Sequence, residues 1–238
     1  MNKIITYKNI RYFAYVNDNI CTKPIKGVVV DFFGQGDCSM FWEDTEIGEF
    51  YAKKGILFIL PYTNPWAWMN SLAISYTDEI VDILFDKYGL SEDIPMVYSG
   101  ISMGGLGALV YTKYSKRTPV ACVTNCPVCD LPYHYTEKPY QPRSLYSAFY
   151  DESGDLDDIL RKYSPYHLAA EMPDIKYYIF HCDKDEAVNI NKHSEHFVEE
   201  MKRLGKDITY EVVHGRGHVD LTEEADKLYK DYICRNIK

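Results

Sequence analysis

The chain has 238 residues, a hydrophobic share of 46% and a formal net charge of −9 at pH 7. This length suits one α/β domain with a sizeable core, and no Ser/Gly-rich or charged linker divides the chain, so we expect a single domain over residues 1–238. The acidic balance argues against nucleic acid or an anionic membrane as the main partner.

The N-terminal sequence lacks the apolar stretch and cleavage site of a signal peptide, and no apolar run reaches the length of a membrane span. These features predict a cytoplasmic protein. The seven cysteines are an odd number, which favours reduced thiols over a disulfide framework.

Short apolar, β-branched runs alternate with helical patterns along the chain. The expected strands are 4–7, 11–16, 27–30, 56–60, 95–99, 120–124, 177–180 and 208–213. The expected helices are 43–54, 71–88, 104–116, 166–171, 191–204 and 219–233. This alternation predicts a mostly parallel sheet with helices on both faces, whose ligand site lies at the carboxyl ends of the strands.

The least regular region spans residues 129–164 and is rich in proline and tyrosine. We expect a small cap-like insertion there, part loop and part helix, over the carboxyl edge of the sheet. Trp66 and Trp68 lie in a loop after the strand at 56–60, and we expect them to line an aromatic substrate pocket, with core and loop packing as the alternative.

Gly100-Ile101-Ser102-Met103-Gly104 follows an expected strand and precedes an expected helix. A Gly-x-Ser-x-Gly match in that setting indicates a nucleophile elbow, in which a sharp turn presents the serine hydroxyl. The two glycines avoid a collision between strand and helix. Ser102 is therefore the candidate nucleophile.

A serine hydroxyl needs a base, and histidine is the natural one because its pKa lies near neutral pH. His218 follows the last expected strand in a glycine-containing loop, with His214 as the competitor. The carboxylate that orients the histidine should follow the preceding strand, where Asp185 is the first choice and Asp183 the alternative.

An oxyanion hole requires two backbone N–H groups. The amide of Met103, directly after the nucleophile, is the first candidate. The second should come from the loop after the strand at 27–30, where we favour Gln35 and place Gly34 next.

The elbow, the order Ser102, Asp185, His218 and the alternating strands resemble the α/β-hydrolase superfamily, in particular its compact esterases and prolyl-oligopeptidase-like hydrolases. The resemblance covers nearly the whole chain from Gly27 onward. Such hydrolases carry a His-Gly pattern at the oxyanion position, where this chain has Phe33-Gly34.

We therefore expect a serine hydrolase that cleaves a small-molecule carboxylic ester, with a small acyl or carbohydrate ester as substrate class and no metal or organic cofactor. The alternatives are a prolyl-oligopeptidase-like peptidase and an inert hydrolase-fold binding protein.

One other motif, formed by Cys122, Cys126 and Cys129, has the spacing of the cluster-binding signature of radical S-adenosylmethionine enzymes. Val128 stands where that family usually has an aromatic residue, and Cys122 falls in an expected strand, so we interpret these cysteines as small core residues.

Overall fold

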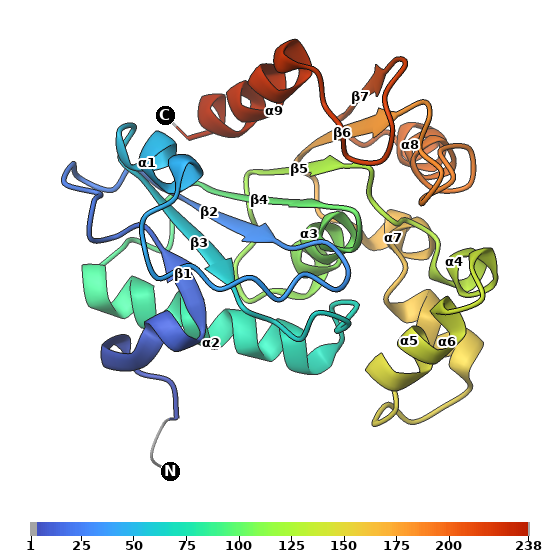
Figure 1. Ribbon diagram of the computed structural model, residues 1–238, viewed down its shortest axis with the longest axis horizontal. Helices are drawn as coiled ribbons and strands as arrows, with labels where there is room; N and C mark the ends of the chain where they lie inside the picture. Colours follow the sequence, from blue (N-terminus) through green and yellow to red (C-terminus); the bar gives the residue numbers. More distant parts are fainter. Residues whose placement is uncertain (1–3, 238) are drawn as a thin grey trace.

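The structure, a computed structural model, describes residues 4–237. Met1–Lys3 and Lys238, which the predicted domain includes, lie outside the described residues. A 7-stranded sheet with the order β1-β3-β2-β4-β5-β6-β7 runs through the molecule (Figure 1). β1 pairs with β3 in antiparallel orientation, and the other neighbouring strands are parallel.

The strands have the following bounds: β1 Ala14–Val16, β2 Gly27–Phe32, β3 Ile56–Pro61, β4 Met96–Ile101, β5 Ala121–Asn125, β6 Lys176–Cys182 and β7 Ile208–Val213. The α-helices are α1 Glu46–Ala52, α2 Ser71–Tyr88, α3 Met103–Tyr114, α4 Leu131–Glu137, α5 Gln141–Ala148, α6 Leu156–Lys162, α7 Pro165–Leu168, α8 Ser194–Arg203 and α9 Glu223–Arg235. Two 3-10 helices, η1 Tyr7–Tyr12 and η2 Ala169–Glu171, complete the described elements.

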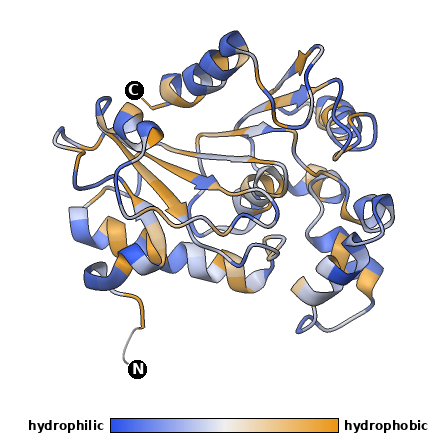
Figure 2. Ribbon diagram, in the orientation of Figure 1, coloured by the Kyte–Doolittle hydropathy of each residue, from blue (hydrophilic) through white to orange (hydrophobic). Residues whose placement is uncertain are grey.

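The central strands are buried on both faces because their side chains alternate between two apolar cores. Val28 and Val30 of β2 join the core that includes side chains from α2, α3 and α8, whereas Val29 joins the core that includes side chains from α1 and α9. Figure 2 shows the resulting hydrophobic colour along β2 and β3. The predicted α/β sheet with helices on both faces is confirmed.

The parallel strands β2, β4, β5, β6 and β7 end at one edge of the sheet. Four of the connections that leave this edge carry the predicted chemistry: the loop after β2, the turn after β4, the loop after β6 and the loop after β7. The topology therefore gathers segments that are far apart in the sequence.

The N-terminal prediction was wrong in part. Of the strand expected over residues 11–16, only Ala14–Val16 form β1, and Arg11 and Tyr12 belong to η1. No strand forms over residues 4–7, of which Tyr7 begins η1. The Asn9 side chain accepts the amide proton of Thr6 at 2.7 Å, and this local bond favours a turn over an extended strand.

Residues 129–164 fold into three short helices, α4, α5 and α6. The two ends of the segment are held together, because the Ser164 hydroxyl donates to the Cys129 carbonyl at 3.0 Å and accepts from the Leu131 amide at 3.1 Å. In Figure 1 this segment lies beyond the carboxyl ends of the central strands.

Within residues 4–237, no helix combines the length and the apolar character that crossing a membrane requires.

The carboxyl group of Asp31, near the end of β2, accepts a hydrogen bond from the Ser99 hydroxyl at 2.5 Å. Burial raises the pKa of Asp31 to about 6, against opposing hydrogen bonds from Ser99 and the Phe32 backbone. A pKa raised in the folded state means that folding favours the protonated form. The contribution of protonated Asp31 to the stability of the folded state is therefore complete below the pKa of the unfolded chain and is lost as the pH rises through about 6.

We expect Asp31→Asn to remove this pH dependence. Relative to the wild type, its free energy of unfolding should rise by about 3 kcal/mol between pH 3.5 and pH 7.5, measured by urea unfolding at each pH. Asp86→Asn, on an exposed position of α2, is the matched control and should show no such trend. A difference between Asp31→Asn and wild type that does not vary with pH would contradict this assignment.

Candidate active site

Ser102 lies at the junction of β4 and α3, with φ 55° and ψ −120°. A positive φ is unfavourable for a residue with a side chain, so the surroundings must hold it. A Cβ built on Gly104 would lie 2.1 Å from the Phe32 carbonyl oxygen, and one on Gly100 would lie 2.3 Å from the Gly104 oxygen. Only glycine fits at either position, and the sharp turn presents the Ser102 hydroxyl.

His218 lies between β7 and α9 and contacts both predicted partners. Its Nε2 lies 2.9 Å from the Ser102 hydroxyl, and its Nδ1 lies 2.6 Å from a carboxylate oxygen of Asp185. Because a carboxylate accepts, the Nδ1–H donates to Asp185 and the Nε2 lone pair faces the serine. The structure thus brings the three predicted catalytic residues together in one hydrogen-bonded series.

Asn125, at the end of β5, ties the two catalytic loops together. Its carbonyl oxygen accepts the Ser102 amide at 3.0 Å, and its side-chain Nδ2 donates to the Val219 carbonyl at 3.1 Å. Val219 follows His218 and also has a positive φ, of 56°. This role was not predicted from the sequence, although a polar residue that ends a central strand is a usable signal.

The Asp185 side chain is 0% exposed and is held from several sides. One oxygen accepts the amides of Ala187 and Val188 at 2.8 and 2.9 Å, and the other lies 3.3 Å from His181 Nε2. Burial would raise the pKa of Asp185, but hydrogen bonds from the two histidines and a backbone amide outweigh burial and hold the pKa well below its usual value. The carboxylate is therefore ionised when it faces His218.

His181 is a second residue whose role was not predicted from the sequence. Its Nε2 lies 3.1 Å from the Val188 carbonyl, which can only accept, so Nε2 carries the proton and Nδ1 accepts from the Ser194 hydroxyl at 2.6 Å. Both ring nitrogens are used, and the ring is buried beside Asp185.

The two alternatives, Asp183 and His214, contact each other and not the serine. Asp183 accepts from His214 Nδ1 at 3.0 Å and from the Gly215 amide at 2.7 Å. The His214 side chain is 81% exposed. A hydrogen bond from His214 and one from the Gly215 backbone lower the pKa of Asp183.

The three oxyanion candidates lie around the elbow. Met103 is the first residue of α3, and a Cβ built on Gly34 would lie 3.9 Å from the Ser102 Cβ. Within residues 4–237, the amides of Met103, Gly34 and Gln35 donate to no protein acceptor. The Gln35 side chain forms a reciprocal amide pair with Gln141 of α5, at 3.1 Å in each direction.

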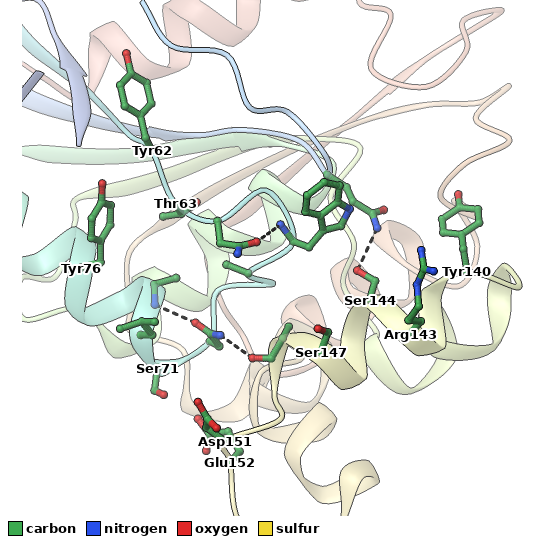
Figure 3. A pocket seen from close by; sticks show the side chains of 18 residues that line it. Tyr62, Thr63, Ser71, Tyr76, Tyr140, Arg143, Ser144, Ser147, Asp151 and Glu152 are labelled. Carbon is green, nitrogen blue, oxygen red and sulfur yellow. Dashed lines mark hydrogen bonds between the residues drawn. The ribbon is translucent and has the colours of Figure 1, made fainter. Parts of the chain in front are cut away.

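Two pockets adjoin these residues. The larger, of about 860 Å³, is lined by Gln35 and by residues of the β3–α2 loop, α2 and α5 (Figure 3). The smaller, of about 470 Å³, is lined by His218 and neighbouring residues. Tyr140 lines both pockets.

The two predicted substrate-contacting tryptophans have different environments. Trp66 lines the larger pocket and is 49% exposed. Trp68 is 0% exposed, and its indole nitrogen donates to the Ser144 hydroxyl at 2.8 Å. The structure therefore differs from the prediction for Trp68, whose side chain supports α5 from within the core.

Two groups of three side chains place metal-ligand atom types within 4.8 Å of one another: Cys126, His181 and Asp185, and His134, Glu137 and His193. His193 Nδ1 accepts the amides of Cys129 and Asp130 at 3.1 and 3.2 Å, so its Nε2 carries the proton and donates to Glu137. A metal would need that Nε2 lone pair, and the same conflict holds for Nε2 of His181. In both rings, the Nε2 atom that would bind a metal already carries a proton and donates it in a hydrogen bond.

The cysteine motif does not converge on one point. Cys122 and Cys129 belong to one apolar core, whereas Cys126 belongs to the other. All three are buried, which agrees with their interpretation as core residues.

Residues 79–232 match the sequence profile of the Prolyl oligopeptidase family. A comparison with curated proteins by sequence found no match.

Several solved structures share the fold. An acylaminoacyl peptidase from Pyrococcus horikoshii superposes with a TM-score of 0.72 at 13% identity, over 91% of this chain and 38% of that one. Esterase PE8 gives a TM-score of 0.60 at 18% identity, over 90% of this chain and 94% of that one. An S-formylglutathione hydrolase from Agrobacterium tumefaciens gives 0.68 at 14% identity, over 94% and 89%. At these identities the likeness concerns the fold, and the chain spans only 38% of the peptidase.

Gly104→Ala should destabilise the fold by at least about 2 kcal/mol, because the new methyl group would collide with the Phe32 backbone. Urea unfolding measures the change. Gly217→Ala is the matched control, since a Cβ there meets nothing within 4 Å, and it should stay within about 0.5 kcal/mol of wild type. Equal stability of the two variants would show that the elbow is not held by this contact.

Proposed function

The chain belongs to the prolyl oligopeptidase family of α/β-hydrolases, and from this premise we propose that it is a serine hydrolase that cleaves a carboxylic ester through Ser102, His218 and Asp185. The observation that carries the proposal is the unbroken series of hydrogen bonds from the Ser102 hydroxyl to His218 and on to the buried Asp185 carboxylate. A serine held in this way has a base to remove its proton.

In the proposed reaction, Ser102 Oγ attacks the ester carbonyl while His218 Nε2 accepts the serine proton. The Asp185 carboxylate stabilises the resulting imidazolium and holds its Nδ1–H. The amides of Met103 and Gln35, with Gly34 as the alternative to Gln35, donate to the oxyanion. His218 then transfers its proton to the leaving alkoxide oxygen, and water releases the acyl group by the same sequence of steps.

Support for an ester over a peptide comes from the esterases among the similar structures. The esterase and the S-formylglutathione hydrolase are covered over 94% and 89% of their own length, whereas the acylaminoacyl peptidase is covered over 38%. The similarity to that peptidase keeps amide hydrolysis as the second candidate. The cytoplasmic location and the exclusion of nucleic acid and membrane partners stay predictions.

A fluorophosphonate probe tests the nucleophile directly. We expect one covalent adduct on the wild type and none on Ser102→Ala, measured by intact-protein mass. Ser102→Ala should also lose turnover of 4-nitrophenyl esters. The wild type should cleave matched 4-nitroanilides more slowly than the esters. An unlabelled wild type without ester turnover would favour the inert binding protein, and faster anilide cleavage would favour the peptidase.

The roles of the two aspartates can be separated by matched substitutions. Asp185→Asn should lower kcat by roughly 10⁴-fold, because the amide no longer fixes the His218 tautomer or stabilises the imidazolium. Asp183→Asn should leave kcat unchanged, since its oxygen can still accept the Gly215 amide. Similar losses in both variants would contradict the assignment of Asp185.

A further inference from the structure

Among the arginines, Arg143 alone has no partner for its charge within residues 4–237. Six of the seven arginines contact a carboxylate or an aromatic ring: Arg11 with Asp18, Arg117 with Asp82 and Glu92, Arg161 with Asp157, Arg203 with Glu200, Arg216 with Asp220, and Arg235 over Tyr178 and Tyr232. Within residues 4–237, Arg143 forms no ion pair and lies over no aromatic ring, although it lines the larger pocket.

The position of Arg143 has no evident structural benefit. It is the third residue of α5, where the positive end of the helix dipole disfavours a cation. The side chain is exposed, so it adds little to the apolar core. A guanidinium kept at such a place is suited to bind a negative group that is not part of the protein.

The position also relates Arg143 to the proposed chemistry. Ser144, the next residue, lies 3.4 Å from the Gln35 side-chain nitrogen, and Gln35 follows Gly34 at the elbow. In Figure 3, Tyr140 and Arg143 lie together at one end of the pocket, and Asp151 and Glu152 lie at the other. The acids are therefore separated from the guanidinium by the length of the pocket.

Two further cations border the smaller pocket. Lys138 and Lys184 line it together with His218, and neither forms an ion pair within the described part of the chain. The Lys138 ammonium donates to the carbonyl of Glu186, whose side chain is the one carboxylate among the residues lining this pocket. The surroundings of the site are thus richer in unpaired cations than a chain of net charge −9 would suggest.

In the proposed ester hydrolysis, the two pockets would receive different parts of the substrate. His218 must transfer a proton to the leaving oxygen, so the pocket that it lines receives the leaving group. The larger pocket, which is lined by Gln35 of the oxyanion loop, would then receive the acyl part. Its volume of about 860 Å³ lies within the range of pockets that enclose a small molecule.

We propose that the acyl part of the substrate carries a carboxylate and that Arg143 binds it. This inference rests on the proposed ester hydrolysis. The planar guanidinium matches a carboxylate with two parallel hydrogen bonds, a geometry that lysine does not reproduce. The substrate class is therefore a monoester of a dicarboxylic acid, in which one carboxyl group is esterified and the other is free.

The experiment compares two substrates that share a leaving group and chain length. These are 4-nitrophenyl hydrogen adipate, with a free carboxylate, and 4-nitrophenyl methyl adipate, in which it is masked. The wild type should prefer the anionic ester. Arg143→Gln should lower the ratio of kcat/KM for the anionic over the neutral ester by about 10- to 100-fold, mainly through KM. Arg143→Lys should fall in between, and added salt should reduce the wild-type ratio.

Arg203→Gln is the matched control, because Arg203 is an exposed helical arginine on α8 that does not line either pocket. It should leave the ratio unchanged. Equal wild-type rates on the two esters, or an Arg143→Gln variant that loses the same factor on both, would overturn the inference. The proposed function would stand in either case if turnover of the neutral ester is lost in Ser102→Ala.

A binding measurement separates the two proposals. Monomethyl adipate is titrated by calorimetry into Ser102→Ala and into Ser102→Ala/Arg143→Gln. Saturable binding to Ser102→Ala that is lost in Ser102→Ala/Arg143→Gln supports the carboxylate site, even if the wild type turns over no ester. In that case only the proposed ester hydrolysis is rejected. Equal binding to both proteins, or binding to neither, rejects Arg143 as the carboxylate ligand.

Discussion

The hydrogen bonds of Asn125 are the interaction on which the site depends. Ser102 and Val219 are among the non-glycine residues that adopt positive φ angles, and each such conformation costs about 1–3 kcal/mol. Asn125 binds both, through its carbonyl oxygen to the Ser102 amide and through its side chain to the Val219 carbonyl. The nucleophile and the base come from loops more than a hundred residues apart, and one residue at the end of β5 fixes their separation.

Burial then distinguishes two pairs of side chains that look alike in the sequence. Asp183–His214 and Asp185–His218 both join a residue after β6 to a residue after β7. The first pair is exposed, and solvent screens its interaction. The second has a fully covered carboxylate whose oxygens are shared between two amides, His181 and His218. Because a buried carboxylate without such partners would be costly, the surrounding donors and the ionised state of Asp185 depend on each other.

The features that the sequence could predict are those encoded locally. Apolar β-branched runs specify the central strands, and the glycines around Ser102 specify the turn, so fold and elbow follow from short stretches. The residue order after the last two strands then indicates where an acid and a base should lie. The roles of Asn125, His181 and Gln141 depend on which strands and helices become neighbours. The spacing of apolar residues along the sequence does not indicate those neighbours. Trp68 shows the same limit, since its burial against Ser144 requires the fold of residues 129–164.

Net charge illustrates a related limit, because it averages over the whole surface. A charge of −9 disfavours an extended polyanion, which must approach many acidic groups at once. A small anion within a pocket senses mainly the charges inside a screening length of about 8 Å at physiological salt. In the larger pocket those charges include the guanidinium of Arg143, which forms no ion pair within residues 4–237, while the other arginines contact partners of their own. The acidic surface and a site that attracts carboxylates are therefore compatible in one chain.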